Sequence, residues 1–198
     1  KPNRDLARLE EIDVVEDFAP LQTNYDKITI GSYATELVRR VTVDDDAEPR
    51  VFDQMRSFFE RLAGAGDDLI VLEVLLRHFQ LQLLQQLGLV GSLDACMRCS
   101  APADALPKVY ALRSGEGLVC ADCVRPSESV GVLYPETLEL LAYIRHPAGQ
   151  PPEAFSTPKV LEQTRRVIDA SVERVVEQPL KSRPMLDTVL APLSDDGP

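Results

Sequence analysis

The first part of the chain places apolar residues at intervals of three to four, which is the spacing of amphipathic helices. Residues 13–41 follow it loosely and predict one helix or a pair of helices. Pro49 suits the first turn of the next helix, and the glycines of "GAG" at 64–66 end it. We expect its buried stripe to consist of Val51, Phe52, Met55, Phe58, Phe59 and Leu62.

Residues 69–87 are apolar on nearly every side, which predicts a helix at the centre of a bundle. Asp67 or Asp68 can cap its beginning, and Gly88 is placed to end it.

The pattern then changes to short alternating elements. "KVYAL" at 108–112 alternates as a strand, and "RSGEG" at 113–117 makes a turn. Two further residues lead directly into Cys120. A β-hairpin is therefore expected in the middle of the chain.

Helical spacing returns in the last third. Pro135 opens a short helix that Pro147 stops, and a proline-rich connector follows at 147–158. Thr157 then caps a long amphipathic helix that Pro179 ends. Its predicted core face consists of Val160, Leu161, Thr164, Val167, Ile168, Val172, Val175 and Val176.

All the cysteines of the chain form two Cys-x-x-Cys pairs, Cys96 with Cys99 and Cys120 with Cys123. Two such pairs at this separation match the pattern of a four-thiolate zinc site. Two disulfides, a thioredoxin-like redox pair and a relic without metal are the alternatives. A closed site with four protein ligands has no open coordination position, so we expect structural Zn2+ and no metal catalysis.

These patterns predict a mainly α protein with a helical bundle domain and an inserted zinc-ribbon-like β-hairpin. The helical domain is expected in two parts, 13–92 and 127–190, around a zinc-binding insertion at 93–126. Residues 191–198 are typical of a disordered tail.

Composition narrows the classes of function. With 44% apolar residues in 198, the chain can form a packed core. It contains no apolar run long enough to cross a membrane and no signal peptide, so a cytoplasmic protein is expected. The chain also begins at Lys1, in mid-pattern, and an N-terminal portion is expected to be missing.

The net charge of −11 gives no basic footprint for nucleic acid. The densest basic group gathers near the C-terminus: Arg165, Arg166, Arg174, Lys181 and Arg183. These residues are either the solvated face of a helix or a small rim that receives an acidic peptide or a DNA backbone.

The chain shows no pattern of a catalytic site. His78 lies in the apolar helix and is typical of a core histidine, while His146 stands at a helix end before a proline. Neither has an evident nucleophile or carboxylate partner, and no phosphate loop or nucleophile elbow is present. The sequence therefore favours a protein that is not an enzyme.

The order of these features resembles the RecO family of bacterial DNA repair and recombination mediators. The resemblance rests on "FAPLQTNYDKITIGSYATELVRRV", "FQLQLLQQLGLVGSLDACMRC", "GEGLVCADC" and "LKSRPML", which occur in the family's order. It implies an N-terminal OB-fold, of which residues 1–12 would be the end or a linker. It also implies Cys96, Cys99, Cys120 and Cys123 as metal ligands.

The resemblance further implies binding of single- and double-stranded DNA, strand annealing and loading of RecA in the bacterial cytoplasm, at the nucleoid. The implied partners are RecR and the single-stranded-DNA-binding protein, whose acidic C-terminal tail we expect to meet Lys181 and Arg183 of "LKSR". Ser100 departs from the family, which often has glycine there. A zinc-ribbon adaptor that binds only protein is the second hypothesis, and a thiol oxidoreductase is the third.

Overall fold

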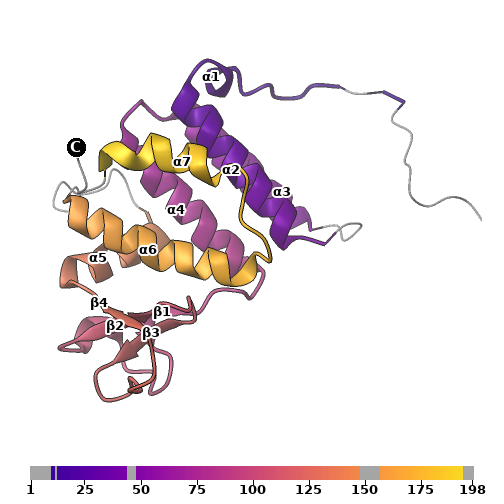
Figure 1. The fold of residues 1–198 in the computed structure, drawn as a ribbon. Helices are drawn as coiled ribbons and strands as arrows, with labels where there is room; N and C mark the ends of the chain where they lie inside the picture. The colour runs from indigo at the N-terminus through magenta and orange to yellow at the C-terminus, as the bar shows by residue number, and fades with distance from the viewer. Residues whose placement is uncertain (1–9, 12, 44–47, 148–156, 194–198) are drawn as a thin grey trace, which may run out of the picture.

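The computed structural model describes residues 10–11, 13–43, 48–147 and 157–193. Most of this chain is helical, and one small sheet lies at an end of the molecule (Figure 1). The helices are α1 (Ala19–Gln22), α2 (Tyr25–Val41), α3 (Pro49–Gly64), α4 (Leu69–Gln86), α5 (Pro135–Arg145), α6 (Pro158–Val175) and α7 (Arg183–Leu190). The strands are β1 (Ser92–Cys96), β2 (Val109–Leu112), β3 (Gly117–Cys120) and β4 (Val130–Val132), and short 3-10 turns form at Ala103–Ala105 and Ala191–Leu193.

Helix α4 is the centre of the fold, as its apolar sequence predicts. The Asp68 side chain accepts hydrogen bonds from the backbone N–H groups of Ile70 and Val71, at 2.9 and 3.5 Å, and so caps its first turn. Gly88, with φ at +69°, follows its last turn in the left-handed conformation that favours glycine. Helices α2, α3, α5 and α6 all pack against α4.

Two apolar cores explain why α4 is apolar on nearly every side. One side of α4, including Leu72 and Leu76, packs with α1, α2, α3 and α7. The other side, including Val74 and Leu81, packs with α5, α6 and the sheet. A helix between two cores buries residues on most of its circumference, and only the glutamines of its last turns, Gln82, Gln85 and Gln86, are exposed, so the apolar pattern of 69–87 follows from its position.

The sheet has the strand order β1-β3-β2-β4. Strands β2 and β3 form the expected antiparallel hairpin, with Tyr110 opposite Val119, and β1 lies parallel to β3. Strand β4 pairs antiparallel with β2 and lies beyond the range 93–126 expected for the insertion. We refer to residues 92–132, from β1 to β4, as the cysteine module. Helices α5 and α6 lie between it and the remaining helices (Figure 1).

Three expectations differ from the structure or fall outside it. Phe52 was expected in the buried stripe of α3, but its side chain is 68% exposed, because it points away from the face of the helix that Val51, Phe58 and Leu62 bury. Ala191–Leu193 were expected to be disordered but continue α7 as a 3-10 turn. Residues 1–9 and 12 of the expected OB-fold remnant, and residues 194–198 of the tail, lie outside the described residues.

In the part of the chain that the structure describes, no helix combines the length and the apolar character that a membrane span requires.

Candidate metal centre and the buried ion network

Four cysteine side chains meet where two neighbouring strands end. Cys96 is the last residue of β1 and Cys120 the last residue of β3. A tight turn follows each: the N–H of Ser100 donates to the carbonyl of Cys96 at 2.8 Å, and the N–H of Cys123 donates to the carbonyl of Cys120 at 3.1 Å. These turns bring back Cys99 and Cys123, and the four Sγ atoms lie within 4.8 Å of one another. The structure thus brings all four predicted ligands together.

The spacing of the sulfur atoms fits a tetrahedral metal. Zinc–thiolate bonds of about 2.3 Å separate neighbouring sulfurs by about 3.8 Å. The Sγ atoms of Cys99 and Cys120 lie 3.8 Å apart, and all four cysteines are free thiols, so neither of the two alternative disulfides has formed. Both pairs contribute to one centre, whereas a thioredoxin-like site needs a single pair at a strand-to-helix junction.

The four thiols influence one another's ionisation. Burial raises the pKa of Cys96, but the backbone N–H groups of Cys99, Cys120 and Arg98 outweigh it and lower this pKa to about 6. Hydrogen bonds with the Cys120 and Cys99 thiols raise the pKa of Cys123 to about 12. Four sulfurs at this distance therefore do not all ionise unaided, and a dication would remove the repulsion between thiolates.

Arg98 ties the two cysteine turns together from outside the centre. Its guanidinium donates to the carbonyl of Cys123 and to both carboxylate oxygens of Glu128. The hydrogen bond from Arg98, with a second from the backbone N–H of Arg125, lowers the pKa of Glu128 to about 2. Arg98 thus places a positive charge beside the centre and holds the loop after Cys123 in place.

The turn between β2 and β3 attaches the cysteine module to α6. Gly115 has φ at +75°, and a Cβ on it would lie 2.1 Å from the carbonyl oxygen of Ala170, so no larger residue fits. Its carbonyl accepts hydrogen bonds from Ser171 Oγ at 3.4 Å and from Arg174 Nε at 3.2 Å. Arg174 also donates to the carbonyl of Leu89. Arg174, predicted as a partner or DNA contact, is therefore engaged within the fold.

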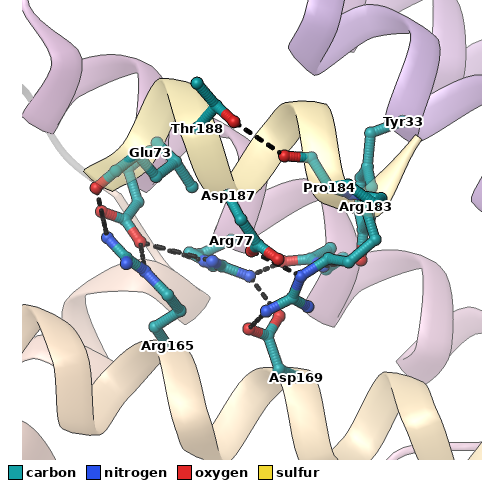
Figure 2. A network of polar contacts seen from close by, with 11 residues as sticks. Tyr33, Glu73, Arg77, Arg165, Asp169, Arg183, Pro184, Asp187 and Thr188 are labelled. Atoms are coloured by element: carbon teal, nitrogen blue, oxygen red, sulfur yellow. Dashed lines mark hydrogen bonds and ion pairs between the residues drawn. The ribbon is translucent and has the colours of Figure 1, made fainter. Parts of the chain in front are cut away.

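Two other members of the predicted basic group belong to a buried ion network (Figure 2). Arg165 on α6 donates to both carboxylate oxygens of Glu73 on α4, at 2.9 and 3.1 Å. Arg183 on α7 donates to Asp169 and to Asp187, each at 2.7 Å. Arg165 and Arg183 are therefore both paired with carboxylates of the fold, of which Glu73 and Asp169 are buried and Asp187 is exposed.

Arg77 lies at the middle of this network (Figure 2), and the sequence analysis assigned no role to this residue. Only 1% of its side chain is exposed. It donates to Asp169 at 2.6 Å, to Gln80 at 2.9 Å and to Glu73 at 3.3 and 3.4 Å, and Gln80 donates in turn to the hydroxyl of Tyr33 at 3.0 Å. Burial acts to lower the pKa of Arg77, but Asp169 and Glu73 outweigh it and raise that pKa.

We define the ion network as Tyr33, Glu73, Arg77, Gln80, Arg165, Asp169, Arg183 and Asp187. Its members come from α2, α4, α6 and α7. The one signal of it in the sequence is the pair Glu73 and Arg77, an i,i+4 pair of opposite charges in an otherwise apolar helix.

The "LKSR" segment leads into α7, and a carboxylate of α2 binds its backbone. Glu36 accepts hydrogen bonds from the N–H groups of Lys181 and Ser182, each at 2.8 Å, and from the Ser182 hydroxyl at 2.7 Å. Burial acts to raise the pKa of Glu36, but these hydrogen bonds outweigh it and lower that pKa. The contact leaves Lys181 exposed to solvent.

The structure does not bring the five basic residues together as one rim. Arg165 and Arg183 share the ion network, Arg174 holds the cysteine module, and Lys181 stands at the start of α7. Arg166 is exposed and pairs with Glu162 one turn earlier on α6, as the solvated-face interpretation predicts.

His78 is a core histidine, as expected. Its side chain is buried, and its Nδ1 lies 2.6 Å from the carbonyl oxygen of Ile144, to which it donates. Burial lowers its pKa, so the ring is neutral at pH 7.

Comparison with known proteins places this arrangement in one family. The family model "Recombination protein O C terminal" matches residues 22–184, which include α2 to α6, the cysteine module and "LKSR". A DNA repair protein RecO of Anaeromyxobacter dehalogenans is 30% identical over 193 residues, covering 93% of this chain and 71% of the relative. A DNA repair protein RecO of Geobacter metallireducens is 29% identical over 93% of this chain and 72% of its own length, and one of Exiguobacterium is 26% identical over 95% and 72%. The chain therefore belongs to the RecO family.

Proposed function

We propose that this chain is the helical, metal-binding part of a RecO recombination mediator that acts in DNA repair. The observation that carries the proposal is the match over residues 22–184, a range that includes helices α2 to α6, both cysteine pairs and "LKSR". The relatives are named for DNA repair, and the proposal extends that role to this chain. In this proposal the protein is not an enzyme and acts by binding DNA and partner proteins, in the bacterial cytoplasm at the nucleoid.

The metal in this proposal is Zn2+, held by Cys96, Cys99, Cys120 and Cys123. Zinc bound there would supply structural cross-linking and no open coordination position. The residues of the chain do the rest: Arg98 holds the two turns against each other, and Gly115 and Arg174 hold the module against α6. The proposed role of the centre is therefore to fix the cysteine module on the bundle.

DNA contact is proposed to lie mainly on an N-terminal OB-fold. The net charge of −11 and the use of Arg165, Arg174 and Arg183 within the fold support that assignment, because nucleic-acid affinity depends on cations that can reach phosphates. Through this contact the full-length protein would bind single and double strands, anneal complementary strands and promote loading of RecA.

The proposed partners are RecR and the acidic C-terminal tail of the single-stranded-DNA-binding protein. Lys181 and Arg183 were expected to meet that tail together. Because Arg183 is paired with Asp169 and Asp187, we assign it to holding α7 in place and leave the contact with the acidic tail to Lys181.

An annealing assay on full-length protein tests the proposal. We expect complementary strands to anneal both bare and coated with the single-stranded-DNA-binding protein. Lys181→Glu should slow annealing of coated strands and leave bare strands unaffected, whereas Arg50→Glu, a matched charge reversal on α3, should affect neither.

The outcomes separate the hypotheses. If Lys181→Glu and Arg50→Glu anneal coated strands at the same rate, Lys181 does not contact the partner. If the full-length protein binds no single-stranded DNA at low salt, the mediator function is wrong, and the protein-only adaptor takes its place.

A further inference from the structure

A groove of about 850 Å³ runs between α5 and the segment that joins the two cysteine pairs. One wall is the face of α5 that carries Leu138, Glu139 and Ala142. The other wall is residues 102–108, which include the 3-10 turn Ala103–Ala105. We call this feature the α5 groove. It lies on the cysteine module and α5, away from the ion network.

Apolar side chains form the inside of the α5 groove. Its buried lining includes Leu93, Ala103, Val109 and Leu133. Half-buried and exposed apolar residues continue up the walls: Pro102, Leu106, Pro107, Val132, Pro135, Leu138 and Ala142. Val132 is 46% exposed. A hollow with continuous apolar walls favours a ligand that brings apolar side chains of its own.

The charged residues on the rim of the groove favour a positively charged ligand. Asp94, Asp104 and Glu139 line the groove together with Lys108 and Arg145. Arg145 donates to Asp94 at 2.9 Å, and Lys108 Nζ lies 5.3 Å from the centre of the Tyr110 ring.

Asp104 and Glu139 are both exposed, and no hydrogen bond or ion pair involves either carboxylate within the described residues. The lining as a whole carries three carboxylates and two cations, so its net charge is negative. The two free carboxylates on opposite walls therefore point to a positively charged ligand.

We propose that the α5 groove binds a segment of a partner protein that is apolar on one side and carries lysine or arginine on the other. Apolar side chains of the segment would fill the space between Leu106 and Leu138, and its cations would pair with Asp104 and Glu139. Nucleic acid does not fit this site, because its phosphates would meet those carboxylates. The inference goes beyond the proposed role in DNA repair and does not depend on it.

Fluorescence anisotropy with two labelled peptides tests the proposal on the intact chain. One peptide has leucine and lysine at helical spacing, and the other has glutamate in place of every lysine. We expect the leucine–lysine peptide to bind and the leucine–glutamate peptide not to bind. Asp104→Lys with Glu139→Lys should weaken binding of the first peptide about tenfold, as expected when interface charges are reversed.

A net negative chain could also attract a cationic peptide anywhere, and two controls address this. Asp53→Lys with Asp13→Lys reverses two exposed carboxylates outside the groove and should change the affinity less than about twofold. Ala142→Arg places a large side chain in the groove at an exposed helical position and should prevent binding without disturbing the core. Gln86→Arg, on the exposed face of α4, is its matched control.

The proposal is overturned if Ala142→Arg and Gln86→Arg bind the leucine–lysine peptide equally well. It is also overturned if the charge reversals inside and outside the groove weaken binding to the same degree. Self-association of the chain that Ala142→Arg abolishes, with no peptide bound, would identify the occupant as a second copy of the chain and not a cationic partner.

Discussion

The cysteine centre and the ion network are both clusters of ionisable groups, but they hold the molecule together in opposite ways. The centre gathers four thiols, which carry like charges when they ionise, from two turns within one small sheet. The network gathers three cations and three carboxylates from helices far apart in sequence, and their charges balance without any added ion. In the proposed assignment a bound metal stabilises the first cluster, and the second is stabilised by charges that only the complete fold brings together.

Metal removal should have the largest effect, and it should be confined to the cysteine module. Without a dication the four sulfurs repel one another when ionised, and structural zinc contributes about 10–16 kcal/mol of binding energy in small zinc domains. We expect a chelator to abolish amide hydrogen-exchange protection in β1, β2 and β3. Protection in α2 and α4 should remain, because their core contains no ligand. Loss of protection in α4 together with the sheet would contradict the separation of the two regions.

Arg77→Met should destabilise the bundle by about 3–5 kcal/mol, because it leaves the carboxylates of Glu73 and Asp169 buried with less compensation. Urea unfolding followed by helical circular dichroism measures this change. The matched control is Arg166→Met, which removes an exposed ion pair on α6 and should change stability by about 0.5 kcal/mol or less. Similar losses in the two variants would show that the network contributes no more than a surface pair.

These two predictions also show which features of the structure can be predicted from the sequence. The ends of α4, at Asp68 and Gly88, depend on residues that are close in sequence. The same holds within each cysteine pair, so spacing alone predicts both features. Arg77 and Asp169 are 92 positions apart, and their contact depends on how α4 and α6 pack. The basic residues near the C-terminus could not be assigned from the sequence for the same reason: the carboxylates that engage Arg165 and Arg183 become neighbours only in the fold.

The pH dependence of stability should include a contribution from His78. Desolvation by burial lowers its pKa in the folded state below the ordinary value of 6.5, so below that pH the unfolded chain binds more protons than the folded one. Stability from this group is complete above about pH 6.5 and is lost as the pH falls toward the folded pKa. Urea midpoints at pH 7.5 and 5.5 should differ less in His78→Gln, which keeps a donor for the Ile144 carbonyl. An unchanged difference would mean that other groups cause the loss.

Ser100→Gly should have the smallest effect and should increase stability. Ser100 has φ at +59°, the left-handed conformation in which a side chain costs energy and which glycine adopts readily. We expect a gain of about 0.5–1 kcal/mol in the cysteine module, measured as slower hydrogen exchange in β1 and β3. Faster exchange would indicate that the serine side chain stabilises the turn.

Metal analysis of the reduced, purified chain tests the central claim most directly, namely that the cysteine module is stabilised by a metal and the bundle by its own ion pairs. We predict about one zinc ion per chain, lost in Cys120→Ser and retained in Arg77→Met. A chain that carries no metal while its cysteine module remains folded would contradict that claim.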